Sequence, residues 1–338
     1  MPNARWISEA DVVRLMHLGD AIKGLEHGLR EEALGSARNM EKTTAHWGSS
    51  SNMHAIGGVF ESAGVFGAKS WGHTPQGSNP LLVLWDAQDG KLLAAIEAMA
   101  LGQMRTGAMS GVATRWMSHP DADDLAIIGS GKQALTQIAA VSAVRKLRRV
   151  RVYSPTVEKR RAFAEQLRSY FSETEIVTRD DVETAVDGAS IITLVTRARE
   201  PVLHASMIAR GSHVNAVGAI TDERKEFAQD IFPRADMVAV DSLPTTQQLS
   251  AEFIEWYDGH QGGDWSGVQR ISDIVARAKP RETTTDISLF KAMGMGISDL
   301  ALGIEILRRA EKAGSGVPIP QRVPVTPRIF EFERETAA

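Results

Sequence analysis

A glycine turn between an apolar run and a helical segment constrains this chain more than any other feature. Residues 125–128 read Leu-Ala-Ile-Ile, and Gly129-Ser-Gly131-Lys-Gln-Ala134 follows directly. In this G-x-G-x-x-A spacing Gly129 permits a tight turn, Gly131 lets backbone N–H groups approach a ligand, and Ala134 keeps helix and strand close. The N-terminus of the helix adds a positive dipole, so the pattern predicts a site for the pyrophosphate of a dinucleotide.

Apolar runs and helical segments alternate through the middle of the chain. Candidate strands lie at 125–128, 150–153, 190–195, 214–217 and 237–240, and candidate helices at 131–146 and 157–170. Such alternation indicates βαβ units and a parallel, doubly wound sheet. The strand at 150–153 also lies where a dinucleotide fold places its second strand.

The first hundred residues have a different pattern. Residues 7–35 show helical periodicity behind Ser8, which is a candidate N-cap. Residues 42–98 consist of short apolar segments separated by turn residues, and we expect them to form an antiparallel sheet. A late amphipathic helix is expected at 298–312.

Composition narrows the possible partners and cofactors. The chain has no cysteine, which excludes disulfides, zinc–thiolate sites, iron–sulfur clusters and thiol nucleophiles. Its 38 basic and 42 acidic residues give a net charge of −4, which provides no electrostatic footprint for nucleic acid. The N-terminus lacks a signal-peptide pattern, residues 81–85 are too short to cross a bilayer, and no histidine pair has metal-ligand spacing. We therefore expect a cytoplasmic protein without a metal, nucleic-acid partner or membrane anchor.

The end of the second parallel strand bears on the choice between NAD and NADP. A carboxylate there would bind the ribose 2′-hydroxyl and repel a 2′-phosphate. This chain instead reads Tyr153-Ser154-Pro155-Thr156. Ser154 and Thr156 are candidates to bind a phosphate at a helix N-terminus, with Arg160 nearby. The sequence therefore slightly favours NADPH over NADH.

Five stretches resemble the ornithine cyclodeaminase/mu-crystallin family in their order and spacing. They are Gly67-Ala-Lys69, Met-Arg-Thr-Gly-Ala-Met-Ser at 104–110, the glycine turn at 127–134, Asn-Ala-Val-Gly at 215–218, and the run from Leu289 to Ala301. The resemblance extends from about residue 5 to residue 315. It covers nearly the whole chain, and it is specific because five modest motifs occur together.

This resemblance implies an α/β fold and a domain division. A Rossmann-type, doubly wound parallel sheet, expected at residues 119–299, is inserted into an α+β substrate-binding and dimerisation domain. The second domain is expected to comprise residues 1–118 and 300–338. The resemblance also implies a homodimer that binds NAD(P) and a small imino- or amino-acid substrate.

Two catalytic candidates are carried over from the family. The resemblance places Lys69 next to the reacting carbon, and a lysine whose pKa is lowered by desolvation can donate or accept a proton there. It places Arg105 on the substrate carboxylate, which a guanidinium can bind in a bidentate fashion while staying charged. We expect Arg105 to open a helix.

The remaining candidates fall into two groups. Those for substrate binding are Lys42, His54, Met293 and Gly294. Those for cofactor binding are Thr106, Gly129, Gly131, Lys132, Gln133, Ala134, Ser154, Thr156, Thr196, Val217 and Asp299. Lys42 is the nearest basic residue to a family arginine that this chain lacks. Whether His54, His73 and Trp71 line the pocket, and which substrate it takes, stays open.

One position separates two kinds of chemistry. Cyclodeaminases of the family place an aspartate where this chain has Ile220, and Asp222 is expected to cap a helix that begins near Glu223. An isoleucine cannot take a proton from a second substrate amine. We therefore predict net redox chemistry by an NAD(P)-dependent reductase or dehydrogenase of a small imino (ketimine) or amino acid. An ornithine cyclodeaminase-type lyase and a mu-crystallin-like NADPH- and ligand-binding protein stay open as alternatives.

Overall fold

A seven-stranded sheet forms the first part of the computed structural model, which describes residues 4–279, 281–320 and 323–329. Its strands are β1 (Arg5–Ile7), β2 (Ala37–Trp47), β3 (Ser51–Phe60), β4 (Val65–His73), β5 (Leu81–Asp86), β6 (Leu92–Glu97) and β15 (Val317–Pro318). Their order is β15-β1-β6-β5-β4-β3-β2, and neighbours from β2 to β6 run antiparallel. The expected antiparallel sheet is therefore confirmed, although its first antiparallel strand starts at Ala37 rather than near residue 42, and β1 joins the sheet in parallel to β6.

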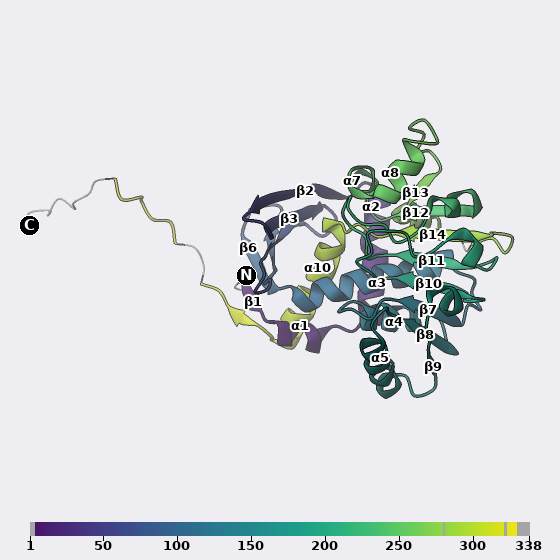
Figure 1. The fold of residues 1–338 in the computed structure, drawn as a ribbon. Helices are drawn as coiled ribbons and strands as arrows, with labels where there is room; N and C mark the ends of the chain where they lie inside the picture. Colours follow the sequence, from purple (N-terminus) through teal and green to yellow (C-terminus); the bar gives the residue numbers. More distant parts are fainter. Residues whose placement is uncertain (1–3, 280, 321–322, 330–338) are drawn as a thin grey trace, which may run out of the picture.

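Four helices accompany this sheet. They are α1 (Glu9–Leu15), α2 (Leu18–Ala33), α3 (Met99–Met117) and α10 (Gly296–Ala313). Ser8 caps α1 as expected, because its Oγ accepts a hydrogen bond from Asp11 N at 3.2 Å. In Figure 1, α10 lies within the curve of the sheet, and α3 runs from there toward the second sheet. The late helix is confirmed, with its start two residues before the expected one.

The start of α10 packs directly against β3. A Cβ atom added at Gly296 would lie 2.0 Å from the carbonyl oxygen of Gly57, so only glycine allows this approach. Ile297 N donates a hydrogen bond to Asn39 Oδ1 on β2 at 2.9 Å, which satisfies an N–H group of the first helical turn. These contacts fix the first turn of α10, which contains Asp299, against β2 and β3, and β3 pairs with β4, the strand that carries Lys69.

An eight-stranded sheet forms the rest of the molecule. Its strands are β7 (Asp124–Ile128), β8 (Arg149–Tyr153), β9 (Glu175–Thr178), β10 (Ile191–Leu194), β11 (His213–Ala216), β12 (Ala235–Val240), β13 (Val268–Arg270) and β14 (Ile287–Lys291). They pair in parallel in the order β13-β12-β14-β11-β10-β7-β8-β9. The expected parallel, doubly wound sheet is confirmed, with β9, β13 and β14 as additional strands.

Helices connect the parallel strands. They are α4 (Ala134–Ser142), α5 (Val157–Tyr170), α6 (Val182–Val186), α7 (Leu243–Leu249), α8 (Ala251–Tyr257) and α9 (Ile271–Arg277), with short 3-10 turns η1 (Ala205–Met207) and η2 (Gln229–Arg234). The helix over 157–170 is confirmed. α4 begins three residues later than expected, because the glycine turn itself occupies the residues before Ala134.

The apolar core lies in three places. One part lies between the seven-stranded sheet and α1, α2, α3 and α10, and it continues past α9 to residues of β12 and β14. The other two cover opposite faces of the eight-stranded sheet, because alternate residues of β7 belong to different clusters. Within the described ranges, no helix is long and apolar enough to cross a membrane, and no three His, Asp or Glu side chains gather where they could hold a metal ion.

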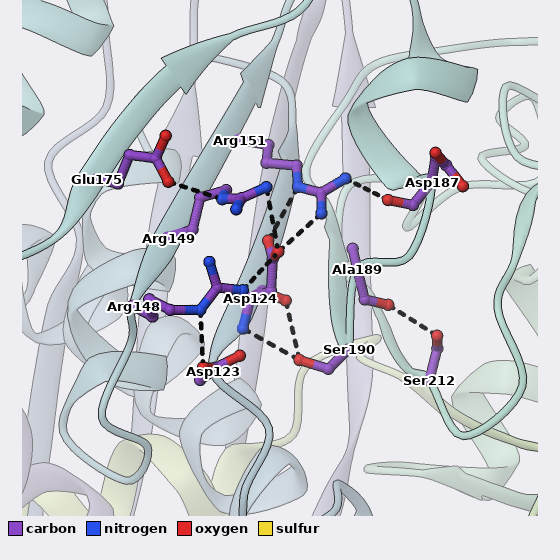
Figure 2. Close-up of polar contacts among 10 residues, drawn as sticks. All are labelled: Asp123, Asp124, Arg148, Arg149, Arg151, Glu175, Asp187, Ala189, Ser190 and Ser212. Atoms are coloured by element: carbon purple, nitrogen blue, oxygen red, sulfur yellow. Dashed lines mark hydrogen bonds and ion pairs between the residues drawn. The ribbon is translucent and has the colours of Figure 1, made fainter.

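Figure 2 shows a network of charged side chains at the amino edge of the eight-stranded sheet. Asp124, the first residue of β7, accepts hydrogen bonds from Nε (2.9 Å) and Nη2 (2.7 Å) of Arg151 on β8. Both side chains are buried. Arg148 also reaches Asp124, and Arg149 pairs with Glu175 of β9 at 2.8 Å. The network therefore ties together the starts of β7, β8 and β9.

Candidate active site

A cleft of about 1150 Å³ lies at the opposite, carboxyl edge of the eight-stranded sheet. The turn between β7 and α4 lines it, together with the loops after β8, β10, β11 and β14. β7 lies between β8 and β10, so the chain order reverses at this point of the sheet. Ligands of doubly wound sheets bind at such a reversal, outside the carboxyl ends of the strands.

The glycine turn at this cleft fits a dinucleotide. Gly129 has φ +117°, and a Cβ atom there would lie 2.6 Å from the carbonyl oxygen of Val195, so a side chain would distort the turn. A Cβ added at Gly131 would meet nothing within 4 Å, which leaves open space beside the backbone. The N-terminus of α4 follows immediately and supplies the positive end of the helix dipole. The local structure therefore suits a pyrophosphate.

The charge of the lining also suits an anionic ligand. The basic residues that line the cleft are Arg105, Lys132, Lys159, Arg197 and Arg224. Among the described residues of its lining, none is acidic. Such an excess of one sign raises the local concentration of oppositely charged ligands.

The structure brings most of the cofactor candidates together. Those that line the cleft are Thr106, Gly129, Gly131, Lys132, Gln133, Ser154, Thr156, Thr196 and Val217. Ala134 is fully buried behind the turn, where its small side chain packs in the core. Arg160 is buried as well. Its guanidinium donates hydrogen bonds to Ser154 O (2.9 Å) and Asp180 Oδ1 (2.6 Å), which hold it away from the cleft. Lys159, rather than Arg160, therefore presents a positive charge to the cleft.

A buried ion pair lies beside one end of the cleft. Lys69 Nζ on β4 donates a hydrogen bond to Asp299 Oδ1 in the first turn of α10 at 2.6 Å. The two residues are 4% and 0% exposed. Asp299 does not line the cleft, because the close packing of α10 on β3 turns this carboxylate toward Lys69. Its expected role in cofactor binding stays a prediction.

The surroundings of Lys69 change its acidity. Burial lowers the pKa of the Lys69 ammonium to about 8, the Asp299 carboxylate opposes that shift, and the positive charge of Arg105 adds to it. A group with such a pKa can give up and regain a proton near neutral pH. The geometry therefore supplies an acid–base group beside the cleft.

Arg105 connects the ion pair with the cleft. It lies in the middle of α3, so the expectation that it opens a helix is wrong, because α3 already begins at Met99. Its Nε lies 3.4 Å from Asp299 Oδ1. The Nε atom is buried and has no hydrogen-bond partner in the described part of the chain. The guanidinium also lies against Gly294, where an added Cβ would be 3.1 Å from Nη1. Arg105 thus faces the cleft, next to Lys69, in a position to bind a carboxylate.

Asp241, which the sequence analysis missed, holds the loop after β14. Its Oδ1 and Oδ2 accept hydrogen bonds from Met293 N and Gly294 N, both at 2.8 Å. Burial raises the pKa of Asp241, while these backbone N–H groups oppose the shift. Met293 and Gly294 line the cleft beside Arg105, and their assignment to substrate binding stays a prediction. A carboxylate directly after the apolar strand of β12 was the signal that could have revealed this residue.

The other substrate candidates lie on β2 and β3, near Lys69. Burial and the charge of Arg105 lower the pKa of Lys42. His54 Nδ1 contacts Thr44 Oγ1 at 2.8 Å, and its ring lies 5.0 Å from that of Trp71. Lys69 Nζ lies 5.0 Å from the same indole ring. Trp71 therefore lies between Lys69 and His54, and none of these side chains is in the lining of the cofactor cleft.

The segment after β11 differs from its expected structure. Ile220 lines the cleft. No helix begins near Glu223, so the expectation that Asp222 caps one is wrong. The chain turns at 221–223 and then forms a parallel bridge between Phe227 and Leu203, which is incompatible with a helix there.

Known proteins are similar to this chain in both sequence and fold. The model of the ornithine cyclodeaminase/mu-crystallin family matches residues 5–314. A Δ1-pyrroline-2-carboxylate reductase from Bacillus cereus is 32% identical over 239 residues, 70% of this chain and 73% of the relative. Ketimine reductase mu-crystallin from Rattus norvegicus is 30% identical over 221 residues, 65% of this chain and 66% of the relative. The structure of Thermococcus litoralis Δ1-pyrroline-2-carboxylate reductase with NADH and L-proline matches with a TM-score of 0.86 and 27% identity, covering 93% of this chain and 100% of the other.

Proposed function

This chain belongs to the ornithine cyclodeaminase/mu-crystallin family, and on that premise we propose that it is an NAD(P)H-dependent reductase of a small imino acid. The observation that carries the proposal is the buried Lys69–Asp299 pair beside Arg105, at the end of a cleft that fits a dinucleotide. Two relatives described above are named as reductases of a pyrroline carboxylate and of ketimines, which supports the same reaction class.

In this proposal Arg105 orients the substrate. Its guanidinium binds the carboxylate next to the C=N bond, and Lys42 adds positive charge on the same side. This interaction places the imine carbon toward the cleft and the imine nitrogen toward Lys69. Holding the reactants in this way lowers the entropic part of the barrier.

Lys69 supplies the proton of the reduction. When bound, the reduced nicotinamide provides the hydride that the imine carbon accepts. The Lys69 ammonium donates its proton to the imine nitrogen, so that C=N becomes CH–NH and Lys69 becomes a neutral amine. Asp299 keeps Nζ in place and favours the ammonium form against the effect of burial. In the oxidative direction the neutral amine accepts the proton.

We also propose that NADPH binds at least as tightly as NADH. Ser154, Thr156 and Lys159 line the end of the cleft after β8, where a carboxylate would select NADH. The structure of the Thermococcus litoralis reductase contains NADH, and that enzyme is 27% identical to this chain. The homodimer implied by the family resemblance stays a prediction.

Ile220 favours reduction over ring closure with loss of ammonia. Its apolar side chain lines the cleft at the position where cyclodeaminases have a carboxylate, and Asp222 lies in a turn two residues later. Without a base at this position, a second substrate amine stays protonated and cannot attack. Cofactor should therefore be consumed in proportion to product.

An activity screen with matched variants tests the proposal. Cyclic imines with a carboxylate, and 2-oxo acids mixed with ammonia or methylamine, are followed by nicotinamide absorbance. Lys69→Ala should lower kcat by about 10²- to 10⁴-fold while the Kd of the dinucleotide stays unchanged, because only proton transfer is lost. Arg105→Leu should mainly raise KM for carboxylate substrates, and Arg105→Lys should restore it only in part.

Two results would contradict this function. One is turnover near the wild-type rate in Lys69→Ala, which would remove this residue from the reaction. The other is formation of proline and ammonia from ornithine over many turnovers, with catalytic NAD and no net change in NADH. That second result would identify a cyclodeaminase and return Asp222 to consideration as the base.

A further inference from the structure

A single buried carboxylate joins two loops of the cofactor cleft. Glu226 is 0% exposed. Its Oε1 accepts hydrogen bonds from Thr196 N (2.6 Å) and Thr196 Oγ1 (2.9 Å), and its Oε2 accepts them from Gly218 N (2.7 Å) and Ala219 N (3.0 Å). Hydrogen bonds to an ionised acceptor are stronger than those between neutral groups. Glu226 therefore fixes both loops through their backbone N–H groups.

The two loops are neighbours in the sheet. Thr196 lies in the loop after β10 and Gly218 in the loop after β11, and these parallel strands pair directly. Thr196 and Gly218 both line the cleft, whereas Glu226 does not. Glu226 thus acts from behind the surface that a ligand would contact.

A second buried pair extends this arrangement to a third loop. Glu226 N donates a hydrogen bond to Glu252 Oε1 at 3.0 Å, and the same oxygen lies 3.2 Å from Lys291 Nζ. Glu252 and Lys291 are both buried. Lys291 is the last residue of β14, and Ala292 directly after it lines the cleft. The ends of β10, β11 and β14 are therefore held by one connected network.

These three loops frame one half of the cleft. The ion pair of Lys69 with Asp299 lies next to Arg105, so the reacting ring of the cofactor must lie at that end. The loop after β14 contributes Met293 and Gly294 there. At the other end, the residues after β8 lie where a dinucleotide fold binds the adenosine ribose. The loops after β10, β11 and β14 therefore surround the nicotinamide half.

We propose that Glu226 is a positioning residue that shapes the nicotinamide half of the cofactor site and leaves the adenosine half unaffected. This inference rests on the proposed use of a dinucleotide. In Glu226→Gln, one oxygen can still accept from Thr196, but the new NH2 group faces the N–H groups of Gly218 and Ala219. The buried N–H group of Ala219 and the partly buried N–H group of Gly218 then lack an acceptor, and the loop after β11 must shift.

Titration calorimetry with two ligands tests this role. NADPH occupies both halves of the site, and ADP probes the adenosine half alone. We expect Glu226→Gln to raise the Kd of NADPH about tenfold or more, with the Kd of ADP within about twofold of the wild-type value. Asp124→Asn is the matched control, because it removes a buried carboxylate from the other edge of the same sheet and should change neither Kd.

The outcomes are distinct. An unchanged Kd of NADPH in Glu226→Gln, or an equal loss of affinity for ADP and NADPH, would overturn the positioning role. If Glu226→Gln does not fold, Glu226→Asp carries the same comparison, because it keeps the charge but reaches only one of the two loops. If the wild-type protein bound neither ADP nor NADPH at any concentration, the proposed function on which this inference rests would be overturned instead.

Discussion

The two edges of the eight-stranded sheet use buried carboxylates in different ways. At the amino edge, Asp124 pairs with the guanidinium of Arg151, and this contact joins side chains of two neighbouring strands (Figure 2). At the carboxyl edge, the Glu226 carboxylate accepts hydrogen bonds from three backbone N–H groups and one hydroxyl group, which belong to two loops. The first arrangement joins strands at the edge opposite the cleft, and the second fixes loops that line the cleft. The same chemical group thus contributes mainly to stability at one edge and to the shape of a site at the other.

Removing the carboxylate at the amino edge should have the largest effect on stability. Asp124→Asn leaves the buried Arg151 without its charged partner, and we expect the free energy of unfolding to fall by about 3 kcal/mol. The Kd of NADPH should stay at the wild-type value. Urea denaturation and calorimetry measure the two quantities. Asp123→Asn is the control, because its half-exposed side chain pairs only with exposed Arg148; equal losses in the two variants would contradict the prediction.

Removing the carboxylate next to Lys69 should change the pH dependence of turnover. In the proposed reaction the Lys69 ammonium donates the proton, so kcat should fall as pH rises through about 8. In Asp299→Asn the opposing carboxylate is lost, the pKa of Lys69 falls further, and the alkaline limb should move about one unit or more to lower pH. Profiles of kcat against pH for wild type, Asp299→Asn and Asp124→Asn check this. The amino-edge variant should keep the wild-type limb, and an unshifted limb in Asp299→Asn would separate Lys69 from the proton transfer.

The smallest effect is expected at the adenosine end of the cleft. Lys159→Ala removes a positive charge from the lining after β8, and the Kd of NADPH should rise about fivefold while that of NADH stays nearly constant. Fluorescence titration with both cofactors measures the difference. Arg161→Ala is the control, since Arg161 lies on the same helix outside the cleft lining. Equal changes for NADPH and NADH would show that Lys159 does not contact a 2′-phosphate.

Local patterns predicted the parts of the fold that depend on neighbours in sequence. The glycine turn, the cap at Ser8 and the apolar strands β7, β8, β10, β11 and β12 all have a signal within a few residues. β9 and β13 lacked one because they are edge strands, whose partial exposure interrupts the apolar run. β14 was missed because its last residue, Lys291, is charged and interrupts the apolar pattern. The Lys291 side chain is nevertheless buried, because it pairs with Glu252.

The contacts that build the site depend on residues far apart in sequence. Lys69 and Asp299 are separated by 230 positions, so no local pattern pairs them. All five residues from Asp222 to Glu226 are charged, which is typical of a solvated loop. Glu226 is nevertheless buried, because the loops after β10 and β11 surround its carboxylate with N–H donors. Only the folded chain shows that this residue differs from its charged neighbours.

The contact between Gly57 and Gly296 limits which positions can be changed when the protein is engineered. A methyl group at position 296 would push α10 away from β3, and the helix would carry Asp299 away from Lys69 with it. Libraries that aim at new substrates should therefore vary His54 and Trp71, whose side chains lie beside the ion pair. Both glycines should stay fixed, because this backbone contact keeps Asp299 beside Lys69, the proposed proton donor, in every redesigned pocket.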